Sequence, residues 1–272
     1  LDRPLRVWLK IDTGMHRLGL EPESVSAVFQ RLRDCPTAMP AIGLMSHLAR
    51  ADERDCDYTL RQLLVFEPAT AGLPGERSLA NSAGILGWPQ AHFDWVRPGI
   101  MLYGASPFVD TLAPDEGLRP VMTFHTRLIS IKRLRRGEPV GYGGTWVCSE
   151  NMDVGVVAVG YGDGYPRHAP SGTPVSIDGR EAALIGRVSM DMITVDLRRH
   201  PEARIGDPVL LWGEGLPVER IARAAGTISY TLLCGVTERV RVETLPLPGL
   251  GRGEPWEESF SAESKDSGEE FR

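Results

Sequence analysis

The chain is poor in lysine, has no block of basic residues and lacks any long apolar run. Only three of its 272 residues are lysine, and the formal net charge is −6. This composition argues against a nucleic acid or an anionic membrane as partner. No apolar run reaches the roughly 18 residues that a transmembrane helix needs, so we predict no membrane span.

Closely spaced cysteine pairs are also missing. Cys35, Cys56, Cys148 and Cys234 show neither CxxC spacing nor the Cys/His pattern of a zinc site, so we predict no metal centre. Isolated cysteines are typical of a reducing compartment, and we predict a cytoplasmic protein. With 42% hydrophobic and 24% charged residues, the chain is an ordinary globular sequence of one or two domains.

Apolar strands and amphipathic helices alternate over the first hundred residues. Helices are predicted from Pro22, which suits a first helical position, and over about 55–71. Alternation of this kind predicts parallel strands joined by right-handed crossovers. The predicted strands are 5–11, 41–45, 78–80 and 93–96.

The pattern changes after residue 120 to short extended segments separated by Gly-rich turns, which predicts a mainly antiparallel β domain. One helix is predicted over 218–225, and the polar, acidic residues 249–272 predict a disordered tail. The predicted strands are 121–132, 154–159, 174–177, 182–187, 192–195, 208–212 and 239–245.

Polar side chains follow the predicted strands of the first half: Lys10 and Arg17, His47, Ser82 and Arg97. The carboxyl ends of parallel barrel strands meet at one mouth, where such folds place their chemistry, so we expect these groups to converge. Arg97 is distinctive because a Pro-Gly turn follows it. That turn stops sheet pairing and lets backbone amides approach a ligand.

Each candidate residue also has an ordinary structural interpretation. Arg97 could be held by a surface carboxylate, and Arg17 by a loop salt bridge. Ser82 could cap a helix, and His47 could be a hydrogen-bonded core histidine. Tyr161 could simply pack in a β-strand. Taken one at a time, the residue types leave these alternatives open.

Five motifs in a fixed order make the sequence specific. They are Val7-Trp-Leu-Lys-Ile-Asp-Thr-Gly-Met-His-Arg-Leu-Gly19, Asn81-Ser-Ala83, Val96-Arg-Pro-Gly-Ile-Met-Leu-Tyr-Gly104, Val159-Gly-Tyr-Gly-Asp-Gly-Tyr-Pro-Arg167 and Gly186-Arg-Val-Ser-Met-Asp191. Together they closely resemble the alanine racemases, pyridoxal-phosphate enzymes that interconvert L- and D-alanine and supply D-alanine for peptidoglycan. The resemblance runs from about residue 5 to residue 245.

The resemblance implies the C-terminal portion of a pyridoxal-phosphate-binding (β/α)₈ TIM barrel, followed by a mainly antiparallel β domain. We predict the partial barrel at 1–117, the β domain at 118–248 and the tail at 249–272. The family's first barrel strand carries the lysine that forms the internal aldimine, before an Ala-Tyr-Gly-His motif that this sequence does not contain. A full barrel takes about 250 residues. We therefore expect an N-terminally truncated chain with negligible activity alone.

The resemblance assigns cofactor contacts residue by residue. Arg97 matches the arginine that faces the pyridine nitrogen. Because a guanidinium keeps its proton, that nitrogen stays unprotonated and the ring is a weaker electron sink, which suits reprotonation over transamination. Ser82, the amides of Gly99 and Ile100, and the Tyr230 hydroxyl match the phosphate contacts.

Further matches imply the proton-transfer groups and a shared site. Tyr161 matches the base that acts on L-alanine; an ordinary tyrosine titrates near ~10, so it needs help to accept a proton. His47 matches the histidine that binds this tyrosine and links it to Arg97. Because Tyr161 lies in the β domain, the resemblance implies a head-to-tail homodimer in which Met190 and Asp191 reach the partner's substrate.

Two basic residues complete the implied site. Arg17 matches the arginine that binds the substrate carboxylate or the cofactor's phenolic oxygen. Lys10 matches a lysine that is carbamylated in many members, which would place an anion beside Arg17. Ser189 stands where some relatives have cysteine, a change we interpret as neutral. A broad-specificity amino-acid racemase and a non-catalytic cofactor-binding or dimerisation fragment remain the alternatives.

Overall fold

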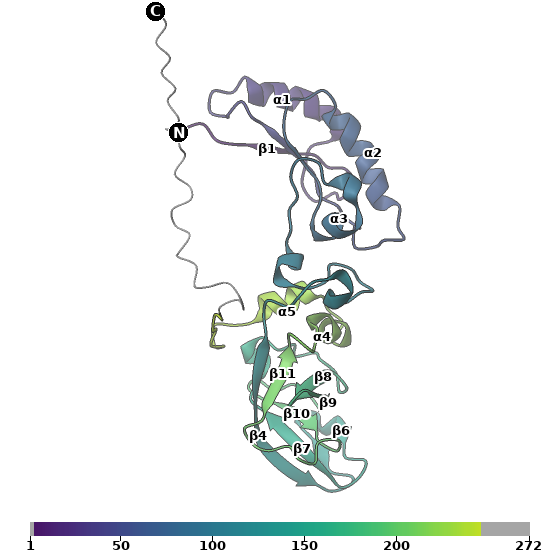
Figure 1. Cartoon of the computed structure of the whole chain (residues 1–272), viewed down its shortest axis with the longest axis vertical. Coiled ribbons are helices and arrows are strands. Elements are labelled where there is room, and N and C mark those ends of the chain that lie inside the picture. The colour runs from purple at the N-terminus through teal and green to yellow at the C-terminus, as the bar shows by residue number, and fades with distance from the viewer. Residues whose placement is uncertain (1–2, 246–272) are drawn as a thin grey trace, which may run out of the picture. The chain divides into compact units, whose positions relative to one another are not determined.

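The computed structural model describes residues 3–245, so the tail predicted at 249–272 lies outside the described residues (Figure 1). Of the described residues, 3–237 form one compact unit and 238–245 belong to another. The first unit contains an α/β part and a β barrel. No helix in residues 3–245 is long and apolar enough to span a membrane.

The α/β part is built on a parallel sheet in the order β1 (Trp8–Lys10), β2 (Gly43–Met45) and β3 (Arg77–Ser78). The parallel pairing confirms the prediction from alternating elements. The strand predicted at 93–96 is wrong: only Trp95 pairs, through a single bridge to Ser78. Phe93 has a φ of +48°, and the Asp94 carboxylate binds the Arg77 amide, so the chain is turned before a strand can form.

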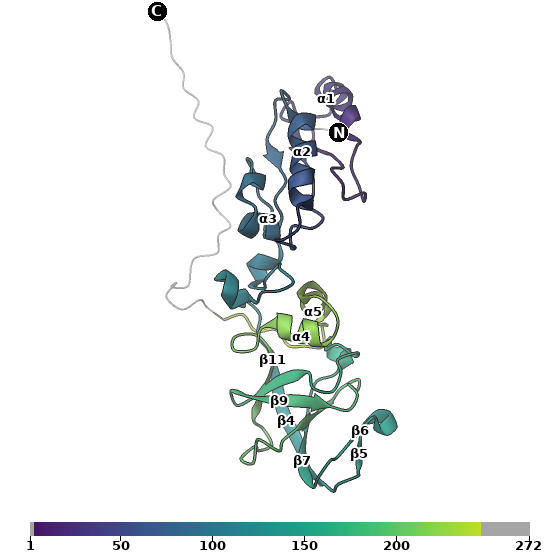
Figure 2. The same cartoon turned by 90° about the vertical axis from the view of Figure 1, so that its right-hand side faces the viewer.

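Three helices accompany this sheet: α1 (Val25–Arg33), α2 (Tyr58–Thr70) and α3 (Ser82–Gly87). A short 3-10 turn with Pro22 at its start precedes α1, as the sequence predicts. Helices α1 and α2 lie side by side (Figures 1 and 2). Their apolar faces share one core with the strands, to which they contribute Phe29 and Phe66, both fully buried.

The second part is a closed antiparallel barrel with strand order β10-β7-β4-β11-β8-β9. Six of the predicted strands are confirmed here, two of them (β8 and β11) at the predicted bounds. Beside the barrel, β5 (Pro139–Val140) and β6 (Trp146–Val147) form a hairpin. The barrel strands are β4 (Phe124–Leu134), β7 (Met152–Val157), β8 (Pro174–Ile177), β9 (Arg180–Ile185), β10 (Ile193–Asp196) and β11 (Pro208–Trp212).

Two helices follow the barrel, α4 (Val218–Ala224) and α5 (Ser229–Gly235). Only α4 is expected from the sequence, because α5 mixes polar, aromatic and β-branched residues in a short run. The strand predicted at 239–245 is wrong, since these residues form no strand and Val242 is 81% exposed. The barrel already closes on itself through its own six strands, so it offers no free edge to a seventh.

The segment that connects sheet and barrel is held by buried and half-buried polar contacts. The Ser106 amide donates to Oε1 of Glu219, a buried carboxylate on α4, at 2.6 Å. Arg54 donates to both carboxylate oxygens of Glu116, at 3.0 and 2.7 Å, and its guanidinium lies 3.5 Å from the centre of the Phe108 ring. The predicted domain boundary at residues 117–118 stays a prediction.

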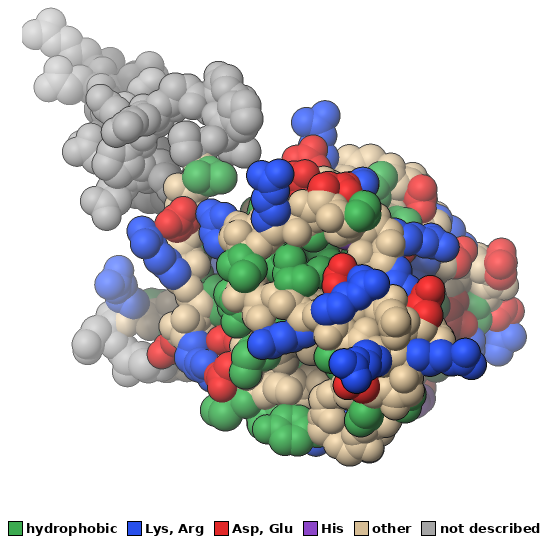
Figure 3. Space-filling model, turned by 90° about the horizontal axis from the view of Figure 1, so that it is seen from below, with side chains coloured by type: hydrophobic (Ala, Val, Ile, Leu, Met, Phe, Trp, Pro, Cys, Tyr) green, Lys and Arg blue, Asp and Glu red, His purple; other side chains and the backbone are tan. Residues whose placement is uncertain are grey.

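Charged side chains of both signs are interspersed with apolar ones on the face of the molecule shown in Figure 3. Many of the charges on the described residues form close pairs. Arg198 binds both Asp196 and Glu150, and Arg133 binds Asp153. Such exposed pairs contribute little to stability individually.

Candidate active site

Arg97 lies two residues after the single bridge at Trp95, and its guanidinium reaches the carboxyl ends of β2 and β3. Its Nη1 donates to the buried Ser78 hydroxyl at 2.5 Å, and its Nη2 donates to the Ser46 carbonyl at 2.6 Å and the Leu79 carbonyl at 3.3 Å. Within residues 3–245 no carboxylate pairs with Arg97, so the surface salt bridge considered above is not what holds it. Partial burial lowers the pKa of Arg97, yet a guanidinium stays charged near neutrality.

His47 lies against this guanidinium. Nη2 of Arg97 is 3.4 Å from Nδ1 of His47. Burial lowers the pKa of His47 from its ordinary value of 6.5, and the positive charges of Arg97, Arg17 and Lys10 lower it further, in that order. The imidazole is therefore neutral at pH 7. Since Arg97 can only donate, Nδ1 accepts and the ring hydrogen resides on Nε2.

The structure thus brings together four of the strand-end groups that the sequence singles out: Lys10, Arg17, His47 and Arg97. Lys10 is half-buried at the end of β1, and Arg17 is exposed in the loop that follows. In the part of the chain that the structure describes, neither pairs with a carboxylate, so the loop salt bridge considered for Arg17 is absent there. Three cations around a neutral imidazole form a site suited to anions.

Ser82 is not the cap of its helix, because Asn81 fills that role by accepting a hydrogen bond from the Gly84 amide at 3.0 Å. The buried Ser82 hydroxyl instead accepts from the Gly99 amide at 2.8 Å and, more weakly, from the Met101 amide at 3.4 Å. Its own hydrogen is left to donate to a ligand.

Two further donors match the predicted anion contacts. Ile100 begins a 3-10 turn, Ile100–Tyr103, and the first amides of a helical turn have no partner within it. Tyr230 lies near the start of α5, half exposed. Burial raises its pKa above the ordinary value and the Asp52 carboxylate raises it further, so the phenol keeps its proton and can donate.

The β barrel presents the remaining predicted residues, Tyr161, Met190 and Asp191, on two adjoining segments. The Tyr161 amide donates to the Ser189 carbonyl at 3.0 Å, and the Gly162 amide donates to the Met190 carbonyl at 2.9 Å. Tyr161 and Met190 are 42% and 51% exposed. No hydrogen bond joins Tyr161 to His47 within residues 3–245, so the structure brings the barrel residues together with one another but not with the Arg97 cluster.

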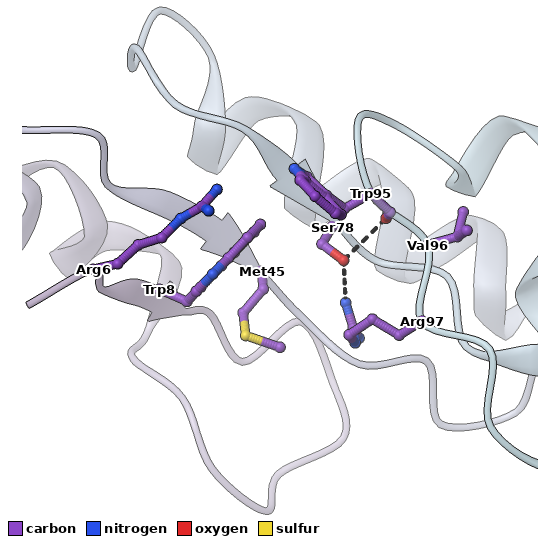
Figure 4. A pocket seen from close by; sticks show the side chains of 7 residues that line it. All are labelled: Arg6, Trp8, Met45, Ser78, Trp95, Val96 and Arg97. Atoms are coloured by element: carbon purple, nitrogen blue, oxygen red, sulfur yellow. Dashed lines mark hydrogen bonds between the residues drawn. The ribbon is translucent and has the colours of Figure 1, made fainter. Parts of the chain in front are cut away.

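A cavity of about 380 Å³ opens beside Arg97 on the sheet. Trp8, Met45 and Trp95 form its apolar wall, and the Ser78 hydroxyl bridges Arg97 and the Trp95 carbonyl at 3.0 Å (Figure 4). Ser78 is a member of this site that the sequence patterns do not single out. The signal that could have found it is a serine directly before the apolar pair Leu79-Ala80, at the end of a strand whose neighbours carry the other groups of the site.

No group of three or more His, Cys, Asp or Glu side chains in the described residues is placed to hold a metal ion. All four cysteines lie within those residues as free thiols. The donors of the site are a guanidinium, an ammonium, hydroxyls and amides. The arrangement can therefore hold a molecule with several negatively charged oxygens.

Two family models match the chain: "Alanine racemase, N-terminal domain" over residues 1–107 and "Alanine racemase, C-terminal domain" over residues 121–244. An alanine racemase of Nitrosococcus oceani is 60% identical over 241 residues, covering 88% of this chain and 67% of that protein. The biosynthetic alanine racemase of Escherichia coli is 54% identical over 244 residues, covering 89% and 68%.

Solved structures show the same similarity. The biosynthetic alanine racemase of Pseudomonas aeruginosa is 53% identical, with a TM-score of 0.86 over 88% of this chain and 67% of that one. The alanine racemase of Acinetobacter baumannii is 41% identical, with a TM-score of 0.81 over 86% and 65%. The chain thus spans about two thirds of the length of the proteins it matches.

Proposed function

The chain belongs to the alanine racemase family, and we propose that it forms the larger part of a pyridoxal-phosphate enzyme that interconverts L- and D-alanine. The observation that carries this proposal is the half-buried Arg97, which donates to a neutral His47 and has no carboxylate partner in the described residues. The Escherichia coli relative is named biosynthetic, which supports a role in D-alanine supply.

The residues present fit the cofactor. A phosphate dianion needs hydrogen-bond donors, and the Ser82 hydroxyl, the Ile100 amide and the protonated Tyr230 phenol supply them. The Gly99 amide already donates to Ser82 and so fixes the orientation of that hydroxyl. Arg97 would face the pyridine nitrogen as a donor that cannot lose its proton. Pyridoxal phosphate, when bound, withdraws electrons from the carbon that loses its proton.

His47 and Tyr161 would carry the proton on the L-alanine side. With Nδ1 occupied by Arg97, the Nε2–H of His47 is left to donate to the phenolic oxygen of the partner's Tyr161, which stabilises negative charge there. That oxygen would take the proton from L-alanine and return it in the reverse direction. The base on the other side would be the cofactor-binding lysine of the family.

A head-to-tail homodimer follows from this assignment. The segment that contacts the Tyr161 turn and the hairpin beside the barrel both expose large apolar side chains, which is typical of a surface that another protein covers. They are Tyr142, Val147, Met190 and Met192. In such a dimer, Met190 and Asp191 would reach the partner's substrate beside Arg17.

Lys10 and Arg17 each carry a positive charge, and no carboxylate of the described residues pairs with either of them. A carbamate on Lys10 would convert one of these cations into an anion that holds Arg17 in place. Mass spectrometry of the native protein would show the added carbon dioxide, and its absence from protein prepared in bicarbonate would contradict this assignment. The predicted cytoplasmic location stays a prediction.

None of the three lysines has the sequence context of the family's cofactor-binding lysine. Lys10 ends β1, Lys132 lies in β4 of the antiparallel barrel, and Lys265 lies outside the described residues. We therefore expect these 272 residues alone to have negligible racemase activity, and expect activity when the lysine-bearing segment of a relative is joined before them.

Absorbance of bound cofactor tests the proposal. Each polypeptide is mixed with pyridoxal phosphate, scanned near ~420 nm, where the cofactor absorbs when bound to a lysine, and treated with borohydride to trap the linkage. We expect a trappable band and racemase activity only in the joined polypeptide. A trappable band in the 272-residue chain would show that one of its own lysines binds the cofactor and would refute our assignment.

A further inference from the structure

Gln62 is a buried amide on α2 that holds the loop carrying His47. The side chain is 1% exposed. Its Nε2 donates to the His47 carbonyl at 2.9 Å, and its Oε1 accepts from the Ala49 amide at 2.8 Å. A carbonyl only accepts and an amide only donates, so these two contacts fix the orientation of the Gln62 side chain.

The second hydrogen of Nε2 reaches another loop. Gln62 donates to Oγ1 of Thr13 at 3.0 Å, Thr13 lies 2.8 Å from Oγ of Ser46, and Ser46 donates to the Ile11 carbonyl at 2.7 Å. Because Ser46 uses its hydrogen on Ile11, Thr13 must donate to Ser46. Thr13 and Ser46 are both buried, and every polar hydrogen of this network already donates a hydrogen bond within it.

The same network reaches the guanidinium. The Ser46 carbonyl accepts from Nη2 of Arg97, the nitrogen that also faces Nδ1 of His47. Gln62 thus ties together the loop after β1, which bears Arg17, and the loop after β2, which bears His47 and the carbonyl that holds Arg97. Residues 13, 46 and 62 come from three different segments.

We propose that Gln62 is a positioning residue of the active site, which holds His47 against Arg97 by fixing the backbone on both sides of the imidazole. A buried amide whose donors and acceptor all form hydrogen bonds has one favourable orientation. It therefore holds the loop at a fixed position relative to α2. Its relevance to racemisation rests on the function proposed above; its effect on His47 does not.

The titration of His47, followed by NMR in the 272-residue chain without cofactor, tests the proposal. The groups that act on this imidazole are Arg97, Arg17 and Lys10. In Gln62→Leu, the His47 carbonyl and Ala49 amide lose their partner, and the loop should carry His47 away from Arg97 and toward solvent. We expect the pKa of His47 to rise toward its ordinary value of ~6.5.

Thr59→Val provides the matched control. Thr59 lies on the same helix, is fully buried, and its hydroxyl has no hydrogen-bond partner in the described residues. We expect this variant to leave the His47 titration unchanged. A purely structural role for Gln62 would lower stability while leaving the titration of His47 as in the parent, and that result would overturn the proposal.

Gln62→Glu is a second variant that tests the proposal if Gln62→Leu does not fold. The carboxylate still accepts from the Ala49 amide but cannot donate to the His47 carbonyl, so His47 should again titrate differently from the parent. A Gln62→Glu chain with an unaltered chemical shift and titration for His47 would count against the proposal. An altered His47 titration with unchanged racemase activity in the joined polypeptide would instead point to an error in the role that the proposed function gives to His47.

Discussion

Gly160 lies where the turn that bears Tyr161 touches the segment that bears Met190. A Cβ atom at Gly160 would lie 2.2 Å from the Met190 carbonyl oxygen and 2.3 Å from the Ser189 carbonyl oxygen. The φ of Gly160 is −152°, an extended conformation that any residue adopts, so close contact alone excludes a side chain. Gly160→Ala must push the two segments apart by about 1 Å to reach ordinary contact distance.

The loss of stability in Gly160→Ala follows from the contacts that this displacement breaks. The hydrogen bonds from Tyr161 to Ser189, at 3.0 Å, and from Gly162 to Met190, at 2.9 Å, both cross the junction. Each contributes about 1 kcal/mol net, and strained packing adds about 1–2 kcal/mol. We expect Gly160→Ala to lower the free energy of unfolding by about 3 kcal/mol and to displace Tyr161 from the position that the proposed function requires.

Urea denaturation followed by tryptophan fluorescence measures the first effect, and racemase activity of the joined polypeptide measures the second. Gly235→Ala is the control, because a Cβ there would lie at an ordinary contact distance of 3.6 Å from the Gly164 carbonyl oxygen. Gly235 ends α5, where alanine should be neutral or slightly stabilising. If both variants unfold at the parent's urea midpoint, the junction does not constrain the Tyr161 turn and our reasoning is wrong.

Three further predictions address other parts of the chain. Arg54→Ala removes the two hydrogen bonds to Glu116 and the contact with the Phe108 ring, and should lower the free energy of unfolding by about 1–2 kcal/mol in urea denaturation. An unchanged free energy of unfolding would show that these contacts do not stabilise the fold. Because the folded state lowers the pKa of His47, the unfolded chain binds more protons just below pH ~6.5. Stability should therefore fall as pH drops through that window, and less steeply in His47→Gln; equal slopes would contradict this. Ser82→Ala should weaken pyridoxal phosphate binding by the joined polypeptide about 10-fold or more, as measured by cofactor titration, and unchanged affinity would remove Ser82 from the phosphate site.

Local patterns in the sequence were sufficient for much of the fold. The strands at 174–177 and 208–212 are short apolar runs between turn residues, and the structure has them at those bounds. The α/β part followed by an antiparallel β domain is confirmed, and solved alanine racemases share this fold. The strand predictions at 93–96 and 239–245 are wrong because an apolar run forms a strand only where the edge of a sheet is free to pair with it. The local sequence pattern carries no information about such an edge.

Residue identity alone also determined part of the chemistry. The permanent charge of Arg97, the Pro-Gly turn after it, and the scarcity of lysine are properties of the chain at any conformation. They are sufficient to predict an anion site at Arg97 and to show that the family's lysine motif is not among these residues.

Only the tertiary structure decided how these groups are held. That Arg97 meets carbonyls and hydroxyls rather than a carboxylate depends on contacts with residues 18 to 51 positions away. The role of Gln62 likewise depends on Thr13 and His47, which are 49 and 15 positions away. Periodicity encodes which face of an element is buried, whereas the pairing of individual polar atoms is settled only when separate loops meet in space.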